Sequence, residues 1–149
     1  GVLNVVNRFL EIIKPRYIFL GIKDFQQCYL INSHILKKKI NTKVIHCKTI
    51  REKNGVACST RNIHLNKNQF KIASNVLAYL KKIKKLTQKK ISNFKIIKIK
   101  NDLINLGVKK IDYIELYNIR TLKRPKNNKE KFKIFIAFYL NKNRLIDNI

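Results

Sequence analysis

The fold follows from one stretch of sequence, Tyr17-Ile18-Phe19-Leu20-Gly21-Ile22-Lys23-Asp24-Phe25-Gln26-Gln27. It begins with an unbroken apolar run that ends at Gly21, which predicts a strand buried on both faces. A helix is expected to open near Asp24, and residues 43–47 predict a second strand. A strand, a helix and a strand at this spacing predict the right-handed crossover of a parallel sheet. This α/β piece is expected to be incomplete, because two strands do not make a stable parallel sheet.

The segments on either side of this unit differ in character. Before it, apolar residues recur at helical spacing over residues 2–13, and Pro15 stops the helix that they predict. After about residue 50 the pattern changes, and Asn54-Gly55 predicts a two-residue hairpin turn between short polar arms.

The remainder of the chain predicts helices followed by strands. Residues 66–89 form an amphipathic helix with Asn66 and Gln69 in capping-box positions, and its lysine-rich end over residues 81–90 is expected on the solvated side. Another helix is expected over residues 91–106. Residues 111–117 and 132–140 predict two strands, the second with alternating apolar residues. This order predicts a small α+β domain with an antiparallel pair.

The composition is strongly basic. Lys and Arg number 34 against 8 Asp and Glu in 149 residues, and the net charge of +26 suggests a nucleic-acid or anionic-membrane partner. However, 24 Ile, 27 Lys and 18 Asn are residues of A/T-rich codons, so codon bias alone can produce this charge. Arginine, the better phosphate ligand, occurs only seven times. No specific nucleic-acid partner is therefore expected, and a non-catalytic, basic RNA-binding module is kept as the alternative function.

Other classes are excluded more firmly. There is no run of about 18 apolar residues, so no membrane span is expected, and no signal segment is expected either. Cys28, Cys47 and Cys58 fit neither a disulfide framework nor a CxxC metal pair. A reduced, cytoplasmic compartment and the absence of a structural zinc site are therefore expected.

The first candidate site is the segment 21–27. Open α/β sheets bind ligands at the carboxyl ends of their strands, and helix N-termini favour anions. Gly21 lets a ligand approach the backbone, and Lys23 supplies a point charge suited to phosphate. Asp24 could orient a ribose or a magnesium-bound water. The alternative is purely structural, because Asp24 and Gln27 also have the spacing of a capping box.

The second candidate site is Cys58-Ser59-Thr60-Arg61-Asn62. Small hydroxyls and one Arg in a loop suit a triphosphate, whereas the alternative is an ordinary polar loop. His46 and His64 have no partner pattern. The sequence contains no Ser/His/Asp or Cys/His arrangement and no GxxxxGK[ST] loop.

Three segments together resemble a known family: FLGIKDFQQ (19–27), TIREKNGVACSTRN (49–62) and NRLIDN (143–148). They are similar to the C-terminal half of the pantoate–β-alanine ligases, or pantothenate synthetases. That family typically reads FGEKDFQQ, then T-x-R-E-x-D-G-L-A-x-S-S-R-N, then RLIDN. The resemblance covers the whole chain, and the combination of segments is highly specific.

The resemblance implies both a fold and an activity. Residues 1–50 would be the C-terminal part of a Rossmann-like, nucleotidyltransferase-type domain, and residues 51–149 a small α+β lid domain with antiparallel strands. The activity would be a cytoplasmic step of coenzyme A precursor synthesis. With ATP and Mg²⁺, pantoate is adenylated and pyrophosphate is released. β-Alanine then attacks pantoyl-adenylate, giving pantothenate and AMP. No enzyme nucleophile is needed, because the carboxylate and amine of the substrates attack.

The resemblance also implies residue roles. ATP-binding residues would be Gly21, Ile22, Lys23, Asp24, Ile50, Cys58, Ser59, Thr60 and Arg61. Of these, Lys23 and Arg61 would act on the phosphates as candidate catalytic residues, and Ile50 would meet the adenine through its backbone. Gln27 would hold pantoate. No residue is implied as a metal ligand.

The chain departs from the family pattern in two ways. Ile22 replaces a Glu, Asn54 an Asp, Thr60 a Ser, and His64 an aromatic residue. The family's first half, with its His-x-Gly-His motif and most of the pantoate and β-alanine pocket, has no counterpart here. Because it starts at Gly1 without Met, the chain is expected to be a fragment, a cleaved product or a reduced gene product, inactive alone. Its expected partners are the missing N-terminal half and, in a homodimer, a second copy.

Overall fold

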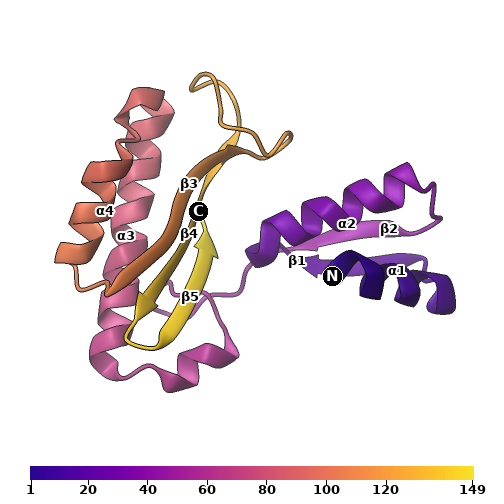
Figure 1. Cartoon of the computed structure of the whole chain (residues 1–149), viewed down its shortest axis with the longest axis horizontal. Helices are drawn as coiled ribbons and strands as arrows, with labels where there is room; N and C mark the ends of the chain where they lie inside the picture. Colours follow the sequence, from indigo (N-terminus) through magenta and orange to yellow (C-terminus); the bar gives the residue numbers. More distant parts are fainter. The chain divides into compact units, whose positions relative to one another are not determined.

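The computed structural model describes all residues 1–149, and these divide into two compact units, Gly1–Thr49 and Ile50–Ile149 (Figure 1). The first unit is an α/β unit, and the second contains one long and one shorter α-helix and an antiparallel sheet. No helix in either unit is long and apolar enough to span a bilayer.

The first unit is a strand–helix–strand crossover preceded by a helix. β1 (Tyr17–Gly21) pairs in parallel with β2 (Lys43–Cys47), and α2 (Phe25–Lys37) connects them. The predicted parallel crossover is therefore confirmed. α1 (Val2–Ile13) ends just before Pro15, as predicted, with Lys14 in the left-handed conformation at φ 47°.

The core of the first unit lies on one face of its sheet only. Its buried residues and the partly buried residues around them come from both helices, from strand positions and from the connection between α2 and β2: Leu10, Ile31, Ile35, Leu3, Val6, Ile18, Leu20, Ile40 and Val44. The side chains of Tyr17 and Phe19 point to the opposite face, where they are 43% and 67% exposed. The prediction of a strand buried on both faces is wrong, because no layer of the first unit covers the second face.

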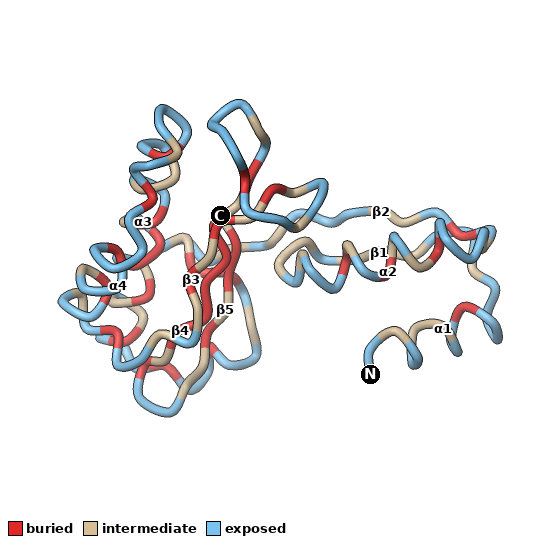
Figure 2. The backbone as a smooth tube through the Cα atoms, turned by 45° about the horizontal axis from the view of Figure 1, so that its top comes forward, coloured by how far each residue is buried: buried red, intermediate tan, exposed pale blue.

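Helix α1 also keeps an uncovered apolar side. Val5, Phe9 and Ile12 are each more than half exposed, whereas Leu10 on the inner side is 3% exposed. In Figure 2 this helix is drawn largely in the colours of intermediate and exposed residues. A helix with apolar residues on two sides is typical of an element that packs between two layers.

The second unit contains a three-stranded antiparallel sheet. β3 (Lys110–Asn118), β4 (Phe132–Leu140) and β5 (Asn143–Asn148) pair in chain order. The sequence predicted only the first two of these strands. β5 is short and mixes polar with apolar residues, and a loop of two residues, Asn141 and Lys142, joins it to β4.

Two helices cover one face of this sheet (Figure 1). α3 (Lys67–Lys89) begins as predicted, with the capping box present: Gln69 N–H donates to Asn66 Oδ1 over 2.9 Å, and Asn66 N–H to Gln69 Oε1 over 3.0 Å. α4 (Ile96–Asn105) begins about five residues later than predicted, after the 3₁₀ turn η3 (Ile91–Asn93). Within this turn, the side-chain amide of Asn93 donates to the last-turn carbonyl of Leu86 in α3 over 2.9 Å, which ties the turn to the end of that helix.

The core of the second unit fills the space between α3, α4 and the sheet. Its most deeply buried large residues are Val76, Leu80, Ile99, Leu103, Ile114, Ile134, Ile136 and Leu140. The even-numbered positions of β4 supply much of this layer, as its alternating pattern predicted. β4 is the most continuously buried strand of the chain, and the sheet of the second unit carries much of the buried colour in Figure 2.

Candidate functional site

The first candidate segment lies at the carboxyl end of a parallel strand. Gly21 closes β1, residues Ile22–Asp24 form the 3₁₀ turn η1, and α2 begins at Phe25. Ligands of open α/β sheets bind at this end of the strands. The structure therefore places the segment where the sequence predicted it.

Nothing in the fold requires a glycine at position 21. Its backbone is extended at φ −70° and ψ 122°, and a Cβ atom built there would meet no atom within 4 Å. The lack of a side chain leaves the end of the strand open to a ligand. The thiol of Cys28 donates to the Gly21 carbonyl over 3.3 Å, and burial, together with the Asp24 carboxylate, raises the pKa of this thiol. Cys28 is thus a neutral packing residue and not a nucleophile.

The capping-box interpretation of this segment is wrong. Asp24 occupies the N-cap position of α2, but its side chain accepts no hydrogen bond from the helix. Both Asp24 and Gln27 are exposed, whereas Lys23 is half-buried. These polar side chains are therefore not explained by helix capping, which was the structural alternative to a binding role.

The second candidate segment follows a hairpin in the second unit. Gly55 N–H donates to Glu52 O, and Glu52 N–H donates to Val56 O, each over 2.8 Å. The loop thus has three residues rather than the predicted two, because Lys53 and Asn54 form the turn and Gly55 follows at φ 86°. Beyond the hairpin, Cys58 N–H donates to Ile50 O over 2.9 Å. This hydrogen bond holds side by side two residues that the resemblance implied as ATP-binding.

The hydroxyl residues and Arg61 lie at the start of η2 (Thr60–His64). Ser59 is its N-cap, and its Oγ accepts from Arg61 N–H over 3.3 Å. Thr60 and Arg61 are exposed, so their side chains are accessible from solvent. The short turn thus presents a hydroxyl and a guanidinium group close together in the chain.

Asn62 holds this turn in place. It is 6% exposed, and its amide Nδ2 donates to Ala57 O over 3.1 Å, which ties η2 to the hairpin. Its Oδ1 is buried without a hydrogen-bond partner. Sequence reasoning included Asn62 in the candidate loop but gave it no role. No local sequence pattern distinguishes Asn62 from an exposed polar residue, because its burial depends on its packing against the hairpin.

An ion pair connects the second and third quoted segments. Arg51 binds Asp147 with both nitrogens, over 2.6 and 2.9 Å, and its Nη1 also donates to Gly55 O over 3.1 Å. The Asp147 side chain is only 5% exposed. The hydrogen bonds that Arg51 donates to the Asp147 carboxylate raise the pKa of Arg51 above its ordinary value. The hairpin is thus fixed to β5 by residues 96 positions apart, which no local pattern could predict.

The predicted site residues form two groups. Gly21, Ile22, Lys23, Asp24 and Gln27 cluster at the β1 end in the first unit, and Ile50, Cys58, Ser59, Thr60 and Arg61 cluster at the hairpin base in the second. A single site that contains both groups is part of the proposal that follows. No three His, Cys, Asp or Glu side chains gather as a metal site would require.

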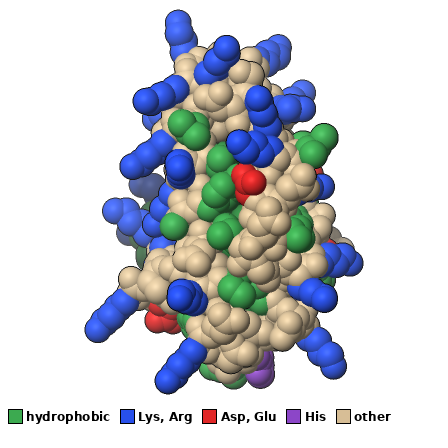
Figure 3. Space-filling model, turned by 90° about the vertical axis from the view of Figure 1, so that its left-hand side faces the viewer, with side chains coloured by type: hydrophobic (Ala, Val, Ile, Leu, Met, Phe, Trp, Pro, Cys, Tyr) green, Lys and Arg blue, Asp and Glu red, His purple; other side chains and the backbone are tan.

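Positive charge is widely distributed over the face shown in Figure 3. Lysine and arginine side chains project around its whole outline, with apolar side chains between them. A nucleic-acid interface gathers basic residues into one patch or stripe. The distribution on this face is the scattered one that codon bias predicts.

The chain was compared with known protein families and structures. The family profile described as "Pantoate-beta-alanine ligase" matches residues 1–149. This chain belongs to the pantoate–β-alanine ligase family. The resemblance noted on the three quoted segments is thereby confirmed. Among curated relatives, the pantothenate synthetase of Flavobacterium psychrophilum is 34% identical over 151 residues, which cover 100% of this chain and 54% of the relative.

Two solved structures show the same fold. The pantothenate synthetase of Thermus thermophilus superimposes with a TM-score of 0.85 at 23% identity, covering 100% of this chain and 54% of that one. The pantoate–β-alanine ligase of Francisella tularensis, solved with a β,γ-ATP compound and β-alanine, gives a TM-score of 0.74 at 33% identity, with 100% and 49% covered. The predicted fold class is confirmed. The chain thus spans about half the length of the relatives that it matches.

Proposed function

We propose that this chain supplies the C-terminal half of a pantothenate synthetase, which joins pantoate and β-alanine at the expense of ATP. Residues 1–50 would complete its nucleotide-binding domain, and residues 51–149 would form its lid. The observation that carries the proposal is the family match over the whole chain. The β1 end supports it, since its open glycine and its half-buried lysine suit a nucleotide phosphate.

The proposed reaction has two steps. A pantoate carboxylate oxygen attacks the α-phosphorus of ATP, and the bond to pyrophosphate breaks, which gives pantoyl-adenylate. The amine of β-alanine then attacks the acyl carbon, the bond to AMP breaks, and the amine proton is lost. Both nucleophiles belong to substrates, so the protein contributes position and charge stabilisation.

In this reaction Lys23 and Arg61 would bind the phosphates as pyrophosphate leaves. Gly21, Ile22, Asp24, Ser59 and Thr60 would line the nucleotide site around them. Ile50 would meet the adenine, and Cys58 would close the loop beside it. Since Cys58 N–H is engaged with the Ile50 carbonyl, these two residues would act together.

Mg²⁺ would accompany ATP rather than occupy a site built by the protein. Magnesium is commonly held by substrate phosphates and keeps several waters, and the exposed carboxylate of Asp24 would orient one of these waters. The ion would neutralise part of the phosphate charge.

The principal proposed partner is the N-terminal half of the family's enzymes, which this chain does not cover. The uncovered face of β1 and the outer side of α1 support this, because both expose large apolar side chains. A homodimer and a cytoplasmic location are proposed by analogy with the family.

The pyrophosphate–ATP exchange reaction tests this proposal. The 149-residue chain alone is expected to show no pantoate-dependent exchange, because the rest of the pantoate pocket is absent. Exchange should appear when the chain is mixed with the N-terminal half of a relative such as the Flavobacterium psychrophilum enzyme. Radiolabelled pyrophosphate incorporated into ATP gives the rate. Strong exchange by the chain alone, or none with any complementing half, would contradict the proposed site.

Gln27 provides a test of the pantoate site. The variant Gln27→Ala is expected to raise the KM for pantoate in the reconstituted enzyme by about 10- to 100-fold, the loss of one hydrogen bond to a charged group. Stability should not change, because Gln27 is exposed and takes no part in capping. The neighbouring variant Gln26→Ala, also at an exposed position, is the control. Equal effects of the two variants would remove pantoate binding from Gln27.

A further inference from the structure

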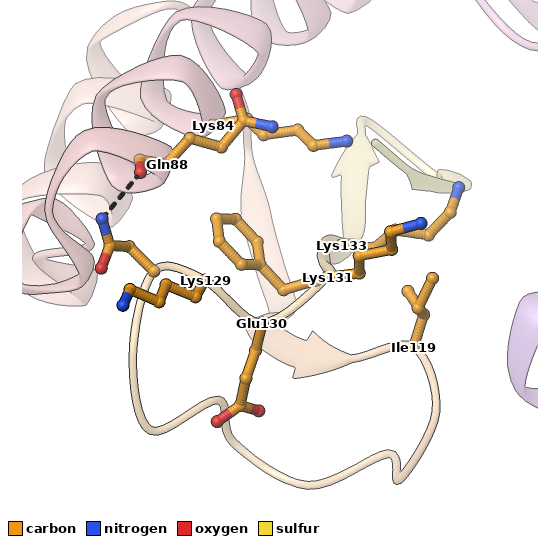
Figure 4. A pocket seen from close by; sticks show the side chains of 9 residues that line it. Lys84, Gln88, Ile119, Lys129, Glu130, Lys131 and Lys133 are labelled. Carbon is orange, nitrogen blue, oxygen red and sulfur yellow. Dashed lines mark hydrogen bonds between the residues drawn. The ribbon is translucent and has the colours of Figure 1, made fainter.

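A cavity lies in the second unit, separate from both candidate segments. Its volume is about 370 Å³, which is at the lower end for ligand pockets and therefore suits a small ligand. It opens between the last turns of α3 and the loop that leads into β4 (Figure 4). The charged residues that line it are Lys84, Lys129, Glu130, Lys131 and Lys133.

The lining is strongly positive. It contains four lysines and only one carboxylate, that of Glu130. This carboxylate is already engaged, because it accepts from the Asn118 side chain and from Lys126 N–H, and these hydrogen bonds lower its pKa. Figure 4 shows its side chain directed away from Lys84 and Lys133. The opposite side of the cavity therefore carries an excess of positive charge.

Lys84 and Lys133 are the two half-buried lysines of this group. Lys84 was expected on the solvated side of α3 with the other lysines of residues 81–90, but its position in the helix turns it toward β4. None of the three ion pairs in the structure includes it. Lys133 donates to the Asn148 side chain, which is neutral. Burial lowers the pKa of both amines. For Lys133 the charge of Lys84 lowers the pKa further, whereas the Asp147 carboxylate, which is already paired with Arg51, raises it in part.

We propose that this cavity binds a small phosphate-type anion, such as inorganic phosphate or pyrophosphate, between Lys84 and Lys133. Two like charges that are partly removed from water repel each other. An anion placed between them is attracted by both ammonium groups, and this attraction offsets their mutual repulsion. Lys131 and Lys129 at the rim would add attraction at longer range. The site does not depend on the proposed enzyme activity.

The test is a calorimetric titration of the 149-residue chain with inorganic pyrophosphate and, in a parallel titration, with inorganic phosphate. Lys84→Gln and Lys133→Gln are each expected to weaken binding by about 10- to 100-fold, the effect of losing one hydrogen bond to a charged group. Lys84→Arg should retain binding, because it keeps the charge. The matched control is Lys85→Gln, which removes the same charge from an exposed position on the same helix and should change affinity less than about twofold.

Two further arms separate this site from the nucleotide site. A chain that carries both Lys23→Ala and Arg61→Ala should still bind pyrophosphate at this cavity, whatever becomes of the proposed ATP site. Circular dichroism of each variant checks that it is folded. If Lys85→Gln weakens binding as much as Lys84→Gln, the charge acts as a diffuse field and the proposal is wrong. The proposal is equally overturned if binding disappears in the Lys23→Ala, Arg61→Ala chain, or if the wild-type chain binds neither anion.

Discussion

Lys23→Ala and Arg61→Ala are each expected to slow adenylation of pantoate by about 10²–10³ in the reconstituted enzyme, which corresponds to roughly 2.7–4 kcal/mol. Negative charge develops on the departing pyrophosphate, and a fixed cation in a closed site stabilises it more strongly than water does. The rate of pantoate-dependent exchange measures the effect. Folding should be unaffected, since Arg61 is exposed and Lys23 lies at a strand end outside the core.

The control for this pair is Lys85→Ala, which removes an exposed lysine from α3. Its rate should equal that of the unmodified enzyme. Lys84 cannot serve as this control because it is half-buried and lines the cavity proposed to bind a phosphate-type anion. If Lys85→Ala slows exchange as much as Lys23→Ala, general positive charge drives the effect, and the RNA-binding alternative becomes the better explanation.

Asp147→Ala is expected to lower the free energy of unfolding of the second unit by about 3 kcal/mol, near the lower end for a broken buried ion pair. The substitution leaves the Arg51 guanidinium, whose side chain is only 26% exposed, without its carboxylate. It also removes the acceptor of Asn148 N–H, which donates to Asp147 Oδ1 over 2.8 Å. Urea denaturation followed by circular dichroism measures the change.

The matched control for this substitution is Asp112→Ala. Asp112 pairs with Arg144 over 2.6 Å, but both side chains are more exposed, at 27% and 38%. Solvent screens this pair, so its loss should cost less than about 1 kcal/mol. If Asp112→Ala and Asp147→Ala destabilise the chain equally, burial of the Arg51–Asp147 pair contributes nothing.

The local structure could largely be predicted from the sequence. Pro15 ends α1, and Asn66 and Gln69 begin α3 with the predicted reciprocal hydrogen bonds. The parallel pairing of β1 and β2 followed from the length of the connection between them. In the site, the position of Gly21 and Lys23 at the end of a strand was likewise predictable, because the apolar run shows where the strand stops.

The sequence did not predict which surfaces meet. It could not show that β5 joins the sheet, that Arg51 pairs with Asp147, or that Lys84 faces β4 while Lys85 faces solvent. Nor could it show that one face of β1 stays uncovered.

The physical reason is the range of the interactions. Caps, turns and helical periodicity act over a few residues, so the sequence by itself determined the helices, most of the strands and the basic, apolar-rich composition. Contacts between distant residues depend on how complete elements pack, and a lysine at one helical position differs from its neighbour only in what lies opposite. Only the tertiary structure therefore decided the third strand, the buried ion pair and the positively charged cavity.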